Sequence, residues 1–489
     1  MKTVLVGLLS AGTVLAQIRT VMLPGKSHVI TVRAVFTTGS AADPEGKSGV
    51  AYLTAAMLAN GGTKDLTYKQ VVDVFFPMAS NVVSQVDQEM TTLESQTHSD
   101  NLEPWYKLYR AMLLDPGWRE DDFKRIRDNA INNLRVGLRG NNDEELGKEV
   151  LYMQLYRGTP YLNYSMGTLS SLEKITLDDL KQFYKQHYTQ SNLILGIAGG
   201  YTPEFLDRMK KDFGTLPQKG STVIPTVKPA AIDHTRALIV EKNTRPVAYS
   251  IGFPIDVKRG DPDFVPLLVM QSYFGQHRMT GGRLMQRIRV ERGINYGDYA
   301  YIEYFPRGMN LFEPQPNLAR QSQIFQIWIR PAEPPQAAFT LRLAVYELNK
   351  LVKEGISQED FDRTKEFLGK YVNVLTKTKN EELGYAIDSL FYGIPDYSRY
   401  VKNSLAKLTR DEVNSSIRKH LRADRLQIVA ISDKAEDLKK QIVGVGPSRI
   451  DYNSPKAKEI LDEDKVVGRF DVGLRPEDVQ ILPVEKVFE

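Results

Sequence analysis

One pattern occurs twice in this sequence, first as KITLDDLKQFYKQHYTQSNLILGI at residues 174–197 and again as KLTRDEVNSSIRKHLRADRLQIVA at residues 407–430. Each copy opens with a threonine, Thr176 or Thr409, and an acidic residue follows three positions later. This spacing is typical of a capping box at a helix N-terminus, and each helix then runs into an apolar strand. The two stretches therefore predict one helix-to-strand unit in two copies.

Shorter matches extend the repeat, in the same order along the chain. DDF at 121–123 matches EDF at 359–361, and LYRGTP at 155–160 matches LFYGIP at 390–395. A period of this length is too long for a solenoid and indicates duplicated domains. Because each half mixes alternating strands with long helices, we expect an α+β protein of two tandem homologous domains, each a mostly antiparallel sheet flanked by helices.

The domain boundaries follow from local composition. Three prolines and few large apolar residues lie between Thr215 and Asp233, which is typical of a linker. The end of the chain is mostly polar, and we expect it to pack on the surface without a chemical role. The predicted segments are a signal peptide at 1–16, an N-terminal domain at 17–214, a linker at 215–235, a C-terminal domain at 236–445 and a tail at 446–489.

The N-terminus resembles an export signal. MKTVLVGLLSAGTVLAQ carries one lysine, an apolar run from Thr3 to Leu15, and small residues before Gln17. We therefore expect an exported protein, periplasmic or secreted, although the same residues would also suit a buried first strand. No other stretch has 18 uninterrupted apolar residues, so no membrane span is expected in the mature chain.

The first half also carries local signals for individual elements. Ile18–Leu23 and Val29–Phe36 are expected to be strands on either side of Pro24-Gly25, in a hairpin-like arrangement. Residues 49–58 are expected to form a helix of small residues, and two long helices should follow at 121–138 and 143–156.

Composition excludes several classes of function. The net charge of the 489 residues is only +4, without a dense block of Lys and Arg, so a nucleic-acid partner is not expected. The absence of cysteine excludes disulfides, thiolate metal sites and cysteine nucleophiles. No G-x-S-x-G motif suggests a serine hydrolase.

The stretch GGRLMQRIRVERGINYG at residues 281–297 predicts a short helix that ends at Gly293 and continues into a strand. Arg289 and Tyr296 lie seven positions apart across that corner, so their side chains can point into one cleft. Both are hydrogen-bond donors suited to holding a peptide carbonyl. A structural alternative stays open, because cations in a last helical turn also offset the helix dipole.

Three motifs together carry a resemblance to a known family. They are ADPEGK at 42–47, G-V-A-x-L-x-x-x-M-L-x-x-G-G-T at 49–63, and G-R-L-x-x-x-I-R-x-x-x-G-x-x-Y at 282–296. Over residues 18–440 the chain resembles the inverzincin metallopeptidases of the insulinase/pitrilysin family, which includes mitochondrial processing peptidase.

The resemblance implies that, in other family members, the helix corresponding to residues 49–58 carries the motif H-x-x-E-H. Its two histidines bind zinc and its glutamate activates water. This chain has Tyr52, Ala55 and Ala56 at those positions. The third ligand of the family, a glutamate, falls near Asn132 and Asn133. We therefore expect a degenerate zinc motif and no metal site in this chain; its six histidines also lie too far apart in sequence to share a helix face.

The resemblance implies a different role for the second half. Some family members are heterodimers, in which one subunit bears zinc and the other supplies an Arg and a Tyr that contact the substrate near the scissile carbonyl. Arg289 and Tyr296 match that spacing, and Gly281 and Gly282 match a glycine-rich lead-in that lets backbone approach a peptide.

The predicted function is thus that of a zinc-less subunit of a metallopeptidase heterodimer. The chain is expected to be inactive alone, to bind peptide, and to act with an H-x-x-E-H-bearing homologous subunit that holds the zinc, with no cofactor of its own. One alternative is a structural or peptide-binding scaffold with no part in proteolysis. Another, a stand-alone peptidase, is disfavoured by the residues at the zinc motif.

Overall fold

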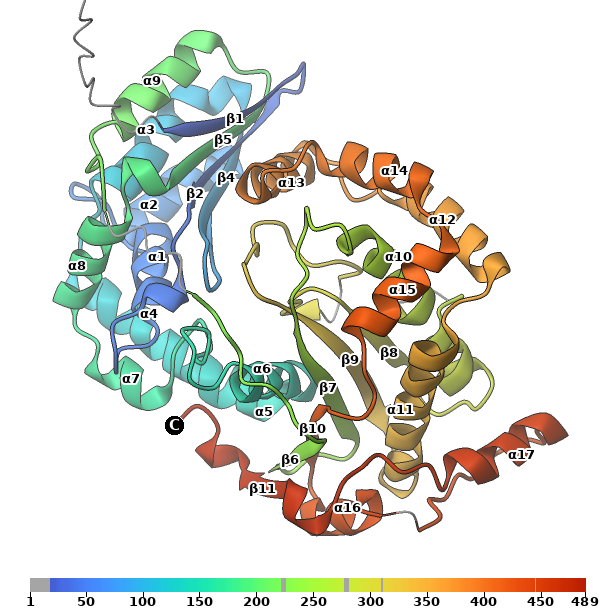
Figure 1. Ribbon diagram of the computed structural model, residues 1–489. Coiled ribbons are helices and arrows are strands. Elements are labelled where there is room, and N and C mark those ends of the chain that lie inside the picture. Colours follow the sequence, from blue (N-terminus) through green and yellow to red (C-terminus); the bar gives the residue numbers. More distant parts are fainter. Residues whose placement is uncertain (1–17, 221–225, 277–280, 309–310, 445) are drawn as a thin grey trace, which may run out of the picture.

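The computed structural model describes residues 18–220, 226–276, 281–308, 311–444 and 446–489, so the predicted signal peptide lies outside the described residues. We call residues 18–213 the first half and residues 236–489 the second half. Each half contains one sheet (Figure 1). The strands of the first half are β1 (Arg19–Pro24), β2 (Val29–Phe36), β3 (Val82–Val86), β4 (Thr91–His98) and β5 (Leu193–Gly199).

The two sheets have the same topology. The first has the order β1-β5-β2-β4-β3, in which only β1 and β5 are parallel. The second has the order β11-β6-β10-β7-β9-β8, so its last five strands repeat the first sheet strand by strand, with β6 and β10 as the corresponding parallel pair. The prediction of two tandem, mostly antiparallel units is confirmed. The strands of the second half are β6 (Arg236–Glu241), β7 (Val247–Ile255), β8 (Gly297–Tyr301), β9 (Gln323–Ala332), β10 (Gln427–Ser432) and β11 (Val479–Pro483).

Helices flank both sheets, and the capping boxes form as predicted. Thr176 accepts a hydrogen bond from the backbone of Asp179, and Thr409 accepts one from Glu412. The helix predicted at 121–138 is an α-helix that continues as the π-helix η4 (Asn133–Leu138). The helices are α1 (Val50–Asn60), α2 (Tyr68–Phe75), α3 (Leu102–Leu114), α4 (Glu120–Asn132), α5 (Arg139–Asn141), α6 (Asp143–Leu155), α7 (Leu169–Lys174), α8 (Leu177–His187), α9 (Pro203–Phe213), α10 (Phe264–Gly275), α11 (Ala337–Glu354), α12 (Gln358–Tyr371), α13 (Lys379–Tyr392), α14 (Tyr397–Lys407), α15 (Arg410–His420), α16 (Ala435–Ile442) and α17 (Lys458–Val467).

Each half covers one face of the other half's sheet. Helix α6 of the first half lies against β7 and β10 of the second, and α13 of the second half lies against β5 and β1 of the first (Figure 1). Gly147 allows the first contact, since a Cβ there would lie 2.9 Å from Ser250 Oγ. Gly196 allows the second, since a Cβ there would lie 2.8 Å from Ile387 Cδ1. The halves are therefore held together by a reciprocal exchange of helices.

The expected hairpin at the start of the chain is wrong. Strands β1 and β2 form where predicted, but β5 lies between them and pairs with both, in parallel with β1 and antiparallel with β2. The residues between β1 and β2 thus form a connection over a third strand that comes from residues 193–199.

The tail also differs from the expectation of a surface segment. Strand β11 extends the second sheet by pairing with β6, and Val487 and Phe488 are buried in the hydrophobic core of the first half. The backbone oxygen of Phe488 accepts a hydrogen bond from Leu169 N, at 2.9 Å. The tail thus contacts both halves.

None of the helices in the described residues is both long enough and apolar enough to cross a membrane.

Candidate functional site

Arg289 and Tyr296 lie side by side at the corner between η6 (Met285–Val290) and β8. The guanidinium carbon of Arg289 is 4.7 Å from the centre of the Tyr296 ring, in a cation–π contact. The helix ends at Val290, and Gly293 follows with a φ of 70°, the left-handed conformation that the sequence predicted for this glycine. Tyr296 is 73% exposed and Arg289 is exposed too. The corner therefore presents both donors to solvent.

The neighbouring arginines hold this corner in place. Arg287 pairs with Glu347 of α11, with Nε to Oε1 at 2.7 Å, and Arg292 pairs with Asp464 of α17, with Nε to Oδ1 at 2.8 Å. Both also pair with Glu463. Arg287 and Arg292 thus have structural roles as partners in buried ion pairs, which the sequence did not predict.

Arg289 is placed differently. Its Nη1 donates to Met285 Sδ at 3.8 Å, and no carboxylate among the described residues lies within 4.0 Å of its guanidinium. The ring and hydrogen-bond contacts of Arg289 and Tyr296 are, within the described ranges, all to residues of the second half. The pair is therefore available to a group from outside the chain.

A buried carboxyl group lies next to the pair. Asp298 is 1% exposed and accepts a hydrogen bond from Asn295 Nδ2 at 2.6 Å. Burial raises the pKa of Asp298 to about 8, although the Asn295 hydrogen bond and the charge of Arg289 lower it. Oδ2 of Asp298 has no hydrogen-bond partner among the described residues. The sequence analysis missed this residue, since an aspartate at the start of a strand carries no signal of burial.

The two glycines before η6 differ in their surroundings. Gly281 is exposed, and an added Cβ would meet no atom within 4 Å. Gly282 is buried, and its carbonyl accepts the first hydrogen bond of the helix from Gln286 N. No contact with the described residues requires glycine at 281, so a role in peptide binding stays a prediction.

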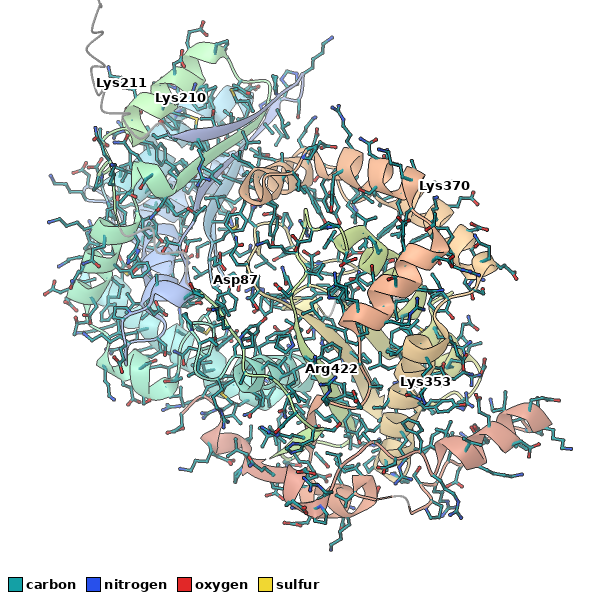
Figure 2. The ribbon with its side chains drawn as sticks, viewed as in Figure 1. Asp87, Lys210, Lys211, Lys353, Lys370 and Arg422 are labelled. Carbon is teal, nitrogen blue, oxygen red and sulfur yellow. The ribbon has the colours of Figure 1, made fainter. Side chains whose placement is uncertain are left out.

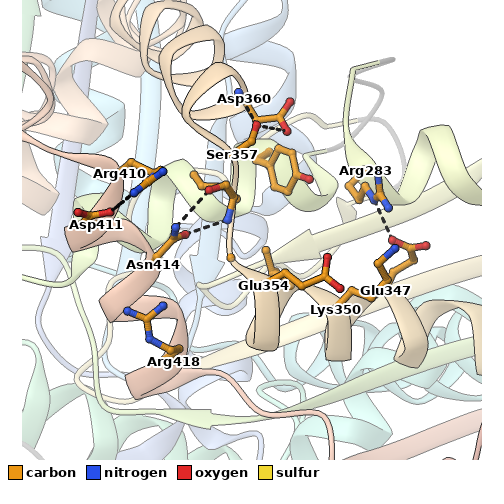
Figure 3. A pocket seen from close by; sticks show the side chains of 14 residues that line it. Arg283, Glu347, Lys350, Glu354, Ser357, Asp360, Arg410, Asp411, Asn414 and Arg418 are labelled. Carbon is orange, nitrogen blue, oxygen red and sulfur yellow. Dashed lines mark hydrogen bonds and ion pairs between the residues drawn. The ribbon is translucent and has the colours of Figure 1, made fainter.

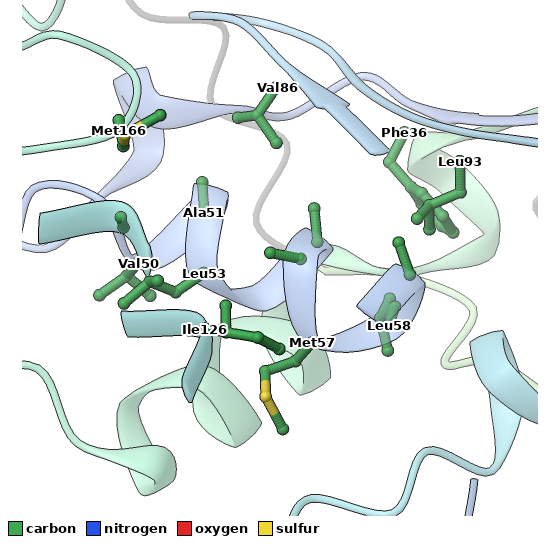
Figure 4. Packing of buried hydrophobic residues seen from close by; sticks show 14 of the residues in the cluster. Phe36, Val50, Ala51, Leu53, Met57, Leu58, Val86, Leu93, Ile126 and Met166 are labelled. Carbon is green, nitrogen blue, oxygen red and sulfur yellow. The ribbon is translucent and has the colours of Figure 1, made fainter. Parts of the chain in front are cut away.

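The positions of the degenerate zinc motif lie on α1 and belong to the core of the first half. Ala55 is fully buried and Ala56 is 5% exposed, and both belong to the same apolar cluster as Leu53 and Leu58 of α1, which are labelled in Figure 4. Tyr52 is half-buried near Arg307 of the second half. Asn133, near the place of the third ligand, is exposed at the start of η4. Neither methyl groups nor a phenol in this arrangement can replace two imidazoles and a carboxylate.

Two histidines that are distant in sequence meet in space. His28 and His98 stack with their ring centres 5.4 Å apart, because His98 is in register with Val29 in the β2–β4 pair. No group of three or more His, Cys, Asp or Glu side chains in the described residues is arranged to hold a metal. Spacing in the sequence excludes two histidines on one helix face, but it does not reveal neighbours on paired strands.

A polar pocket of about 580 Å³ lies on the helical side of the second half, near Arg283 and Glu347 (Figure 3). Its charges are balanced and several are paired with one another, so the lining favours no class of ligand. The charged lining residues are Arg283, Lys350, Arg410, Arg418, Glu347, Glu354, Asp360 and Asp411.

Comparisons with known proteins agree with these features. Residues 21–169 match the model of the insulinase family (peptidase family M16), and residues 174–368 match the model of the peptidase M16 inactive domain. The chain is 23% identical over 417 residues to the non-peptidase homolog YmxG of Helicobacter pylori, which covers 83% of this chain and 89% of that protein. It is 22% identical over 270 residues to the probable mitochondrial-processing peptidase subunit beta of Arabidopsis thaliana, which covers 53% of this chain and 50% of that protein.

A solved structure shares the fold. The crystal structure of a peptidase M16 inactive domain from Pseudomonas fluorescens superposes with a TM-score of 0.74 at 22% identity, and the match covers 85% of this chain and 96% of that one. The two family models thus match consecutive stretches that contain the quoted motifs and the corner of Arg289 and Tyr296, whereas β10 and β11 of the second sheet lie beyond the second stretch. The chain belongs to the insulinase family, peptidase family M16.

Proposed function

We propose that this chain is a zinc-less subunit that binds peptide and acts together with a homologous, H-x-x-E-H-bearing subunit. The observation that carries the proposal is an asymmetry between the halves. The first half has no zinc ligands at Tyr52, Ala55 and Ala56, whereas the second half presents Arg289 and Tyr296, in contact and exposed.

The chemistry divides between the two subunits. The partner holds the zinc, the general base and the attacking water. Arg289 and Tyr296 donate hydrogen bonds to the carbonyl oxygen of the peptide and stabilise the negative charge that develops on it, while neither acts as the base. This chain then needs no cofactor of its own.

An exposed sheet edge supports peptide binding. Val83 on the edge strand β3 is 51% exposed, and β3 makes no backbone hydrogen bond to any described segment other than β4. An extended peptide can add to such an edge through its main chain. The corresponding edge strand of the second sheet, β8, is buried along its whole length.

To test this, the chain is co-purified with its partner from the native source, and the two subunits are separated and then recombined. Peptidase activity is measured for each subunit alone and for the recombined pair. Arg289→Ala is expected to lower kcat/KM of the recombined pair about 100-fold, because one carbonyl donor is removed. Tyr296→Phe should lower it less, since the ring and its contact with Arg289 remain. Arg245→Ala is the matched control, because the Arg245 side chain is 86% exposed and lies 3.9 Å from its nearest carboxylate, Glu333. Full activity of both site variants in an assembled pair would overturn the proposed role.

The second candidate is a scaffold or peptide-binding protein without a part in proteolysis. The similarity to a protein described as a non-peptidase homolog favours it. A recombined pair that binds peptide and never cleaves it would support this candidate. Stoichiometric zinc and cleavage by the purified chain alone would instead support a stand-alone peptidase.

We also propose that the chain is exported, with residues 1–16 as the signal. N-terminal sequencing of the protein from its native source tests this, and a mature N-terminus at Gln17 is expected.

A further inference from the structure

The connection between β8 and β9 is much longer than its counterpart in the first half. Strands β3 and β4 are joined by residues 87–90, whereas the equivalent strands of the second half are joined by residues 302–322. Residues 313–321, EPQPNLARQ, contain no helix or strand. They lie between the halves, where they contact the β3–β4 turn of the first half and helix α13 of their own half. Asp388 of α13 accepts hydrogen bonds from the backbone N–H of Asn317, and Tyr392 OH accepts one from that of Arg320. We call residues 313–321 the plug.

Arg320 anchors the plug. Its Nη2 and Nε donate to the two carboxylate oxygens of Asp87, at 2.5 and 3.2 Å, and both side chains are 2% exposed. The guanidinium carbon lies 3.6 Å from the centre of the Tyr304 ring and 5.1 Å from that of Tyr161. Asp87 belongs to the β3–β4 turn, on the side of the first half that is turned toward the second half (Figure 2). The cation is thus held by a buried bidentate pair between two aromatic rings.

Side chains of the first half also bind the plug backbone. Gln85 Nε2 donates to the carbonyl oxygens of Pro316 and Asn317, at 3.1 and 3.2 Å. Glu89 accepts from the backbone N–H of Gln321 at 2.9 Å. Main-chain hydrogen bonds of this kind, combined with one charged anchor, are a general way to hold an irregular peptide segment.

Apolar contacts complete the fit. Ala319 is 5% exposed and packs in a cluster with Val35, Met90 and Ile194 of the first half. Arg33, on β2, donates from Nη1 to the side-chain oxygen of Asn317 at 2.6 Å. The first half therefore contacts the plug through an ionic site, an amide site and an apolar site in succession.

We propose that the inner face of the first half, around Gln85, Asp87 and Glu89, is a peptide-binding site, and that the chain fills this site with its own residues 316–321. The ligand class is an irregular or extended segment that carries an arginine. Without the plug, Asp87 would lose its direct ion pair with Arg320, which is costly for a buried carboxylate and which an incoming arginine would restore. The tether keeps the plug at high effective concentration, so free peptides are excluded.

This proposal does not depend on a partner subunit or on Arg289 and Tyr296. It assigns a closed peptide site behind the plug, in addition to the exposed contacts proposed above at the corner before β8 and at the edge of β3.

The test removes the plug from the chain and supplies it as a separate peptide. Residues 313–321 are replaced by a Gly-Ser linker of equal length, and binding of a fluorescent peptide EPQPNLARQ is measured by anisotropy. The linker variant is expected to bind the peptide saturably, while the unaltered chain does not. A peptide with methionine in place of arginine should bind at least about tenfold more weakly, because the charge-assisted contact to Asp87 is lost. Asp87→Asn in the linker variant should have the same effect. A folded linker variant that does not bind the peptide would overturn the proposal.

A second measurement decides the case if the linker variant does not fold. Hydrogen exchange of the unaltered chain is followed by mass spectrometry, and peptides that cover residues 313–321 are compared with those that cover β2 and β4. If the plug can leave its site, its hydrogen bonds break while those of the sheet stay intact. The backbone amides of the plug should then exchange at least about tenfold faster than those of the strands. Equal exchange of plug and strands would show that residues 313–321 are ordinary core, and the proposal would be wrong.

Discussion

Three arginines within one short stretch of sequence, Arg287, Arg289 and Arg292, have different roles that spacing alone cannot separate. Arg287 and Arg292 pair with acidic residues of α11 and α17, which come from far along the chain. Arg289 is distinguished only by the lack of such a pair among the described residues, together with its contact with Tyr296. The sequence predicted that Arg289 and Tyr296 can share one cleft, and the structure places them in contact. Their catalytic role stays a prediction.

Asp298 predicts a pH dependence of stability. Its folded pKa of about 8 lies above the value of about 3.9 expected in the unfolded chain, so between these values the folded state binds more protons. Its contribution to stability is therefore complete below about pH 4 and is lost as pH rises toward 8. Asp298→Asn should remove a slope of up to about 1.4 kcal/mol per pH unit from the free energy of unfolding between about pH 5 and 7.

Urea denaturation at a series of pH values measures this slope. Asp178→Asn is the control and should leave the slope unchanged, because the Asp178 side chain is 89% exposed. An Asp298→Asn slope equal to that of the unaltered chain would mean that this carboxyl group is ionised in the folded protein.

At the scale of elements, local sequence signals predicted helix ends reliably, whereas the predicted pairing of strands was wrong. The capping boxes at Thr176 and Thr409 depend on three or four neighbouring residues, and both form as predicted. The hairpin of β1 and β2 failed because the strand between them comes from residues 193–199. Sequence patterns fix which face of a strand is buried, but they do not say which strand lies next to it.

The reciprocal packing of α6 and α13 depends on small residues at the contacts. Gly147→Leu is expected to destabilise the protein by about 1–3 kcal/mol, because the new side chain overlaps β7 and pushes α6 away from the second sheet. Chemical denaturation measures the change.

Gly369→Leu is the matched control. Gly369 also lies within a helix, α12, but an added Cβ there meets nothing within 4 Å. Leucine at this position should be neutral or stabilising by up to about 1 kcal/mol, since it favours the helix over glycine. Similar losses in both variants would argue against close packing as the cause.

At the scale of the whole molecule, the segments that join the halves could not be predicted. Arg320 and Asp87 are separated by 233 positions, and a polar loop gives no indication of the partner that buries it. The tail is similar, because Val487 and Phe488 follow a long polar stretch and yet belong to the core of the first half. The repeat revealed two units, but it contained no information on how they pack.

Phe488 tests whether the tail holds the halves together. Phe488→Ala should lower the free energy of unfolding by about 3–5 kcal/mol, because a buried ring is lost from the first half. Phe76→Ala is the control, since Phe76 is 82% exposed and its loss should change stability by less than about 0.5 kcal/mol. A similarly small effect at Phe488 would mean that the end of the chain frays in solution.

The exchange of α6 and α13 has a consequence for the ancestry of the fold. A single ancestral unit, before duplication, would have left one face of its sheet exposed to solvent. Only the corresponding helix of a second copy could have covered that face. Such a reciprocal exchange of helices between two copies is the geometry of a domain-swapped homodimer. The present chain has the arrangement that fusing two such protomers end to end would produce. If the chain is cut between α9 and β6, the two fragments should therefore stay associated.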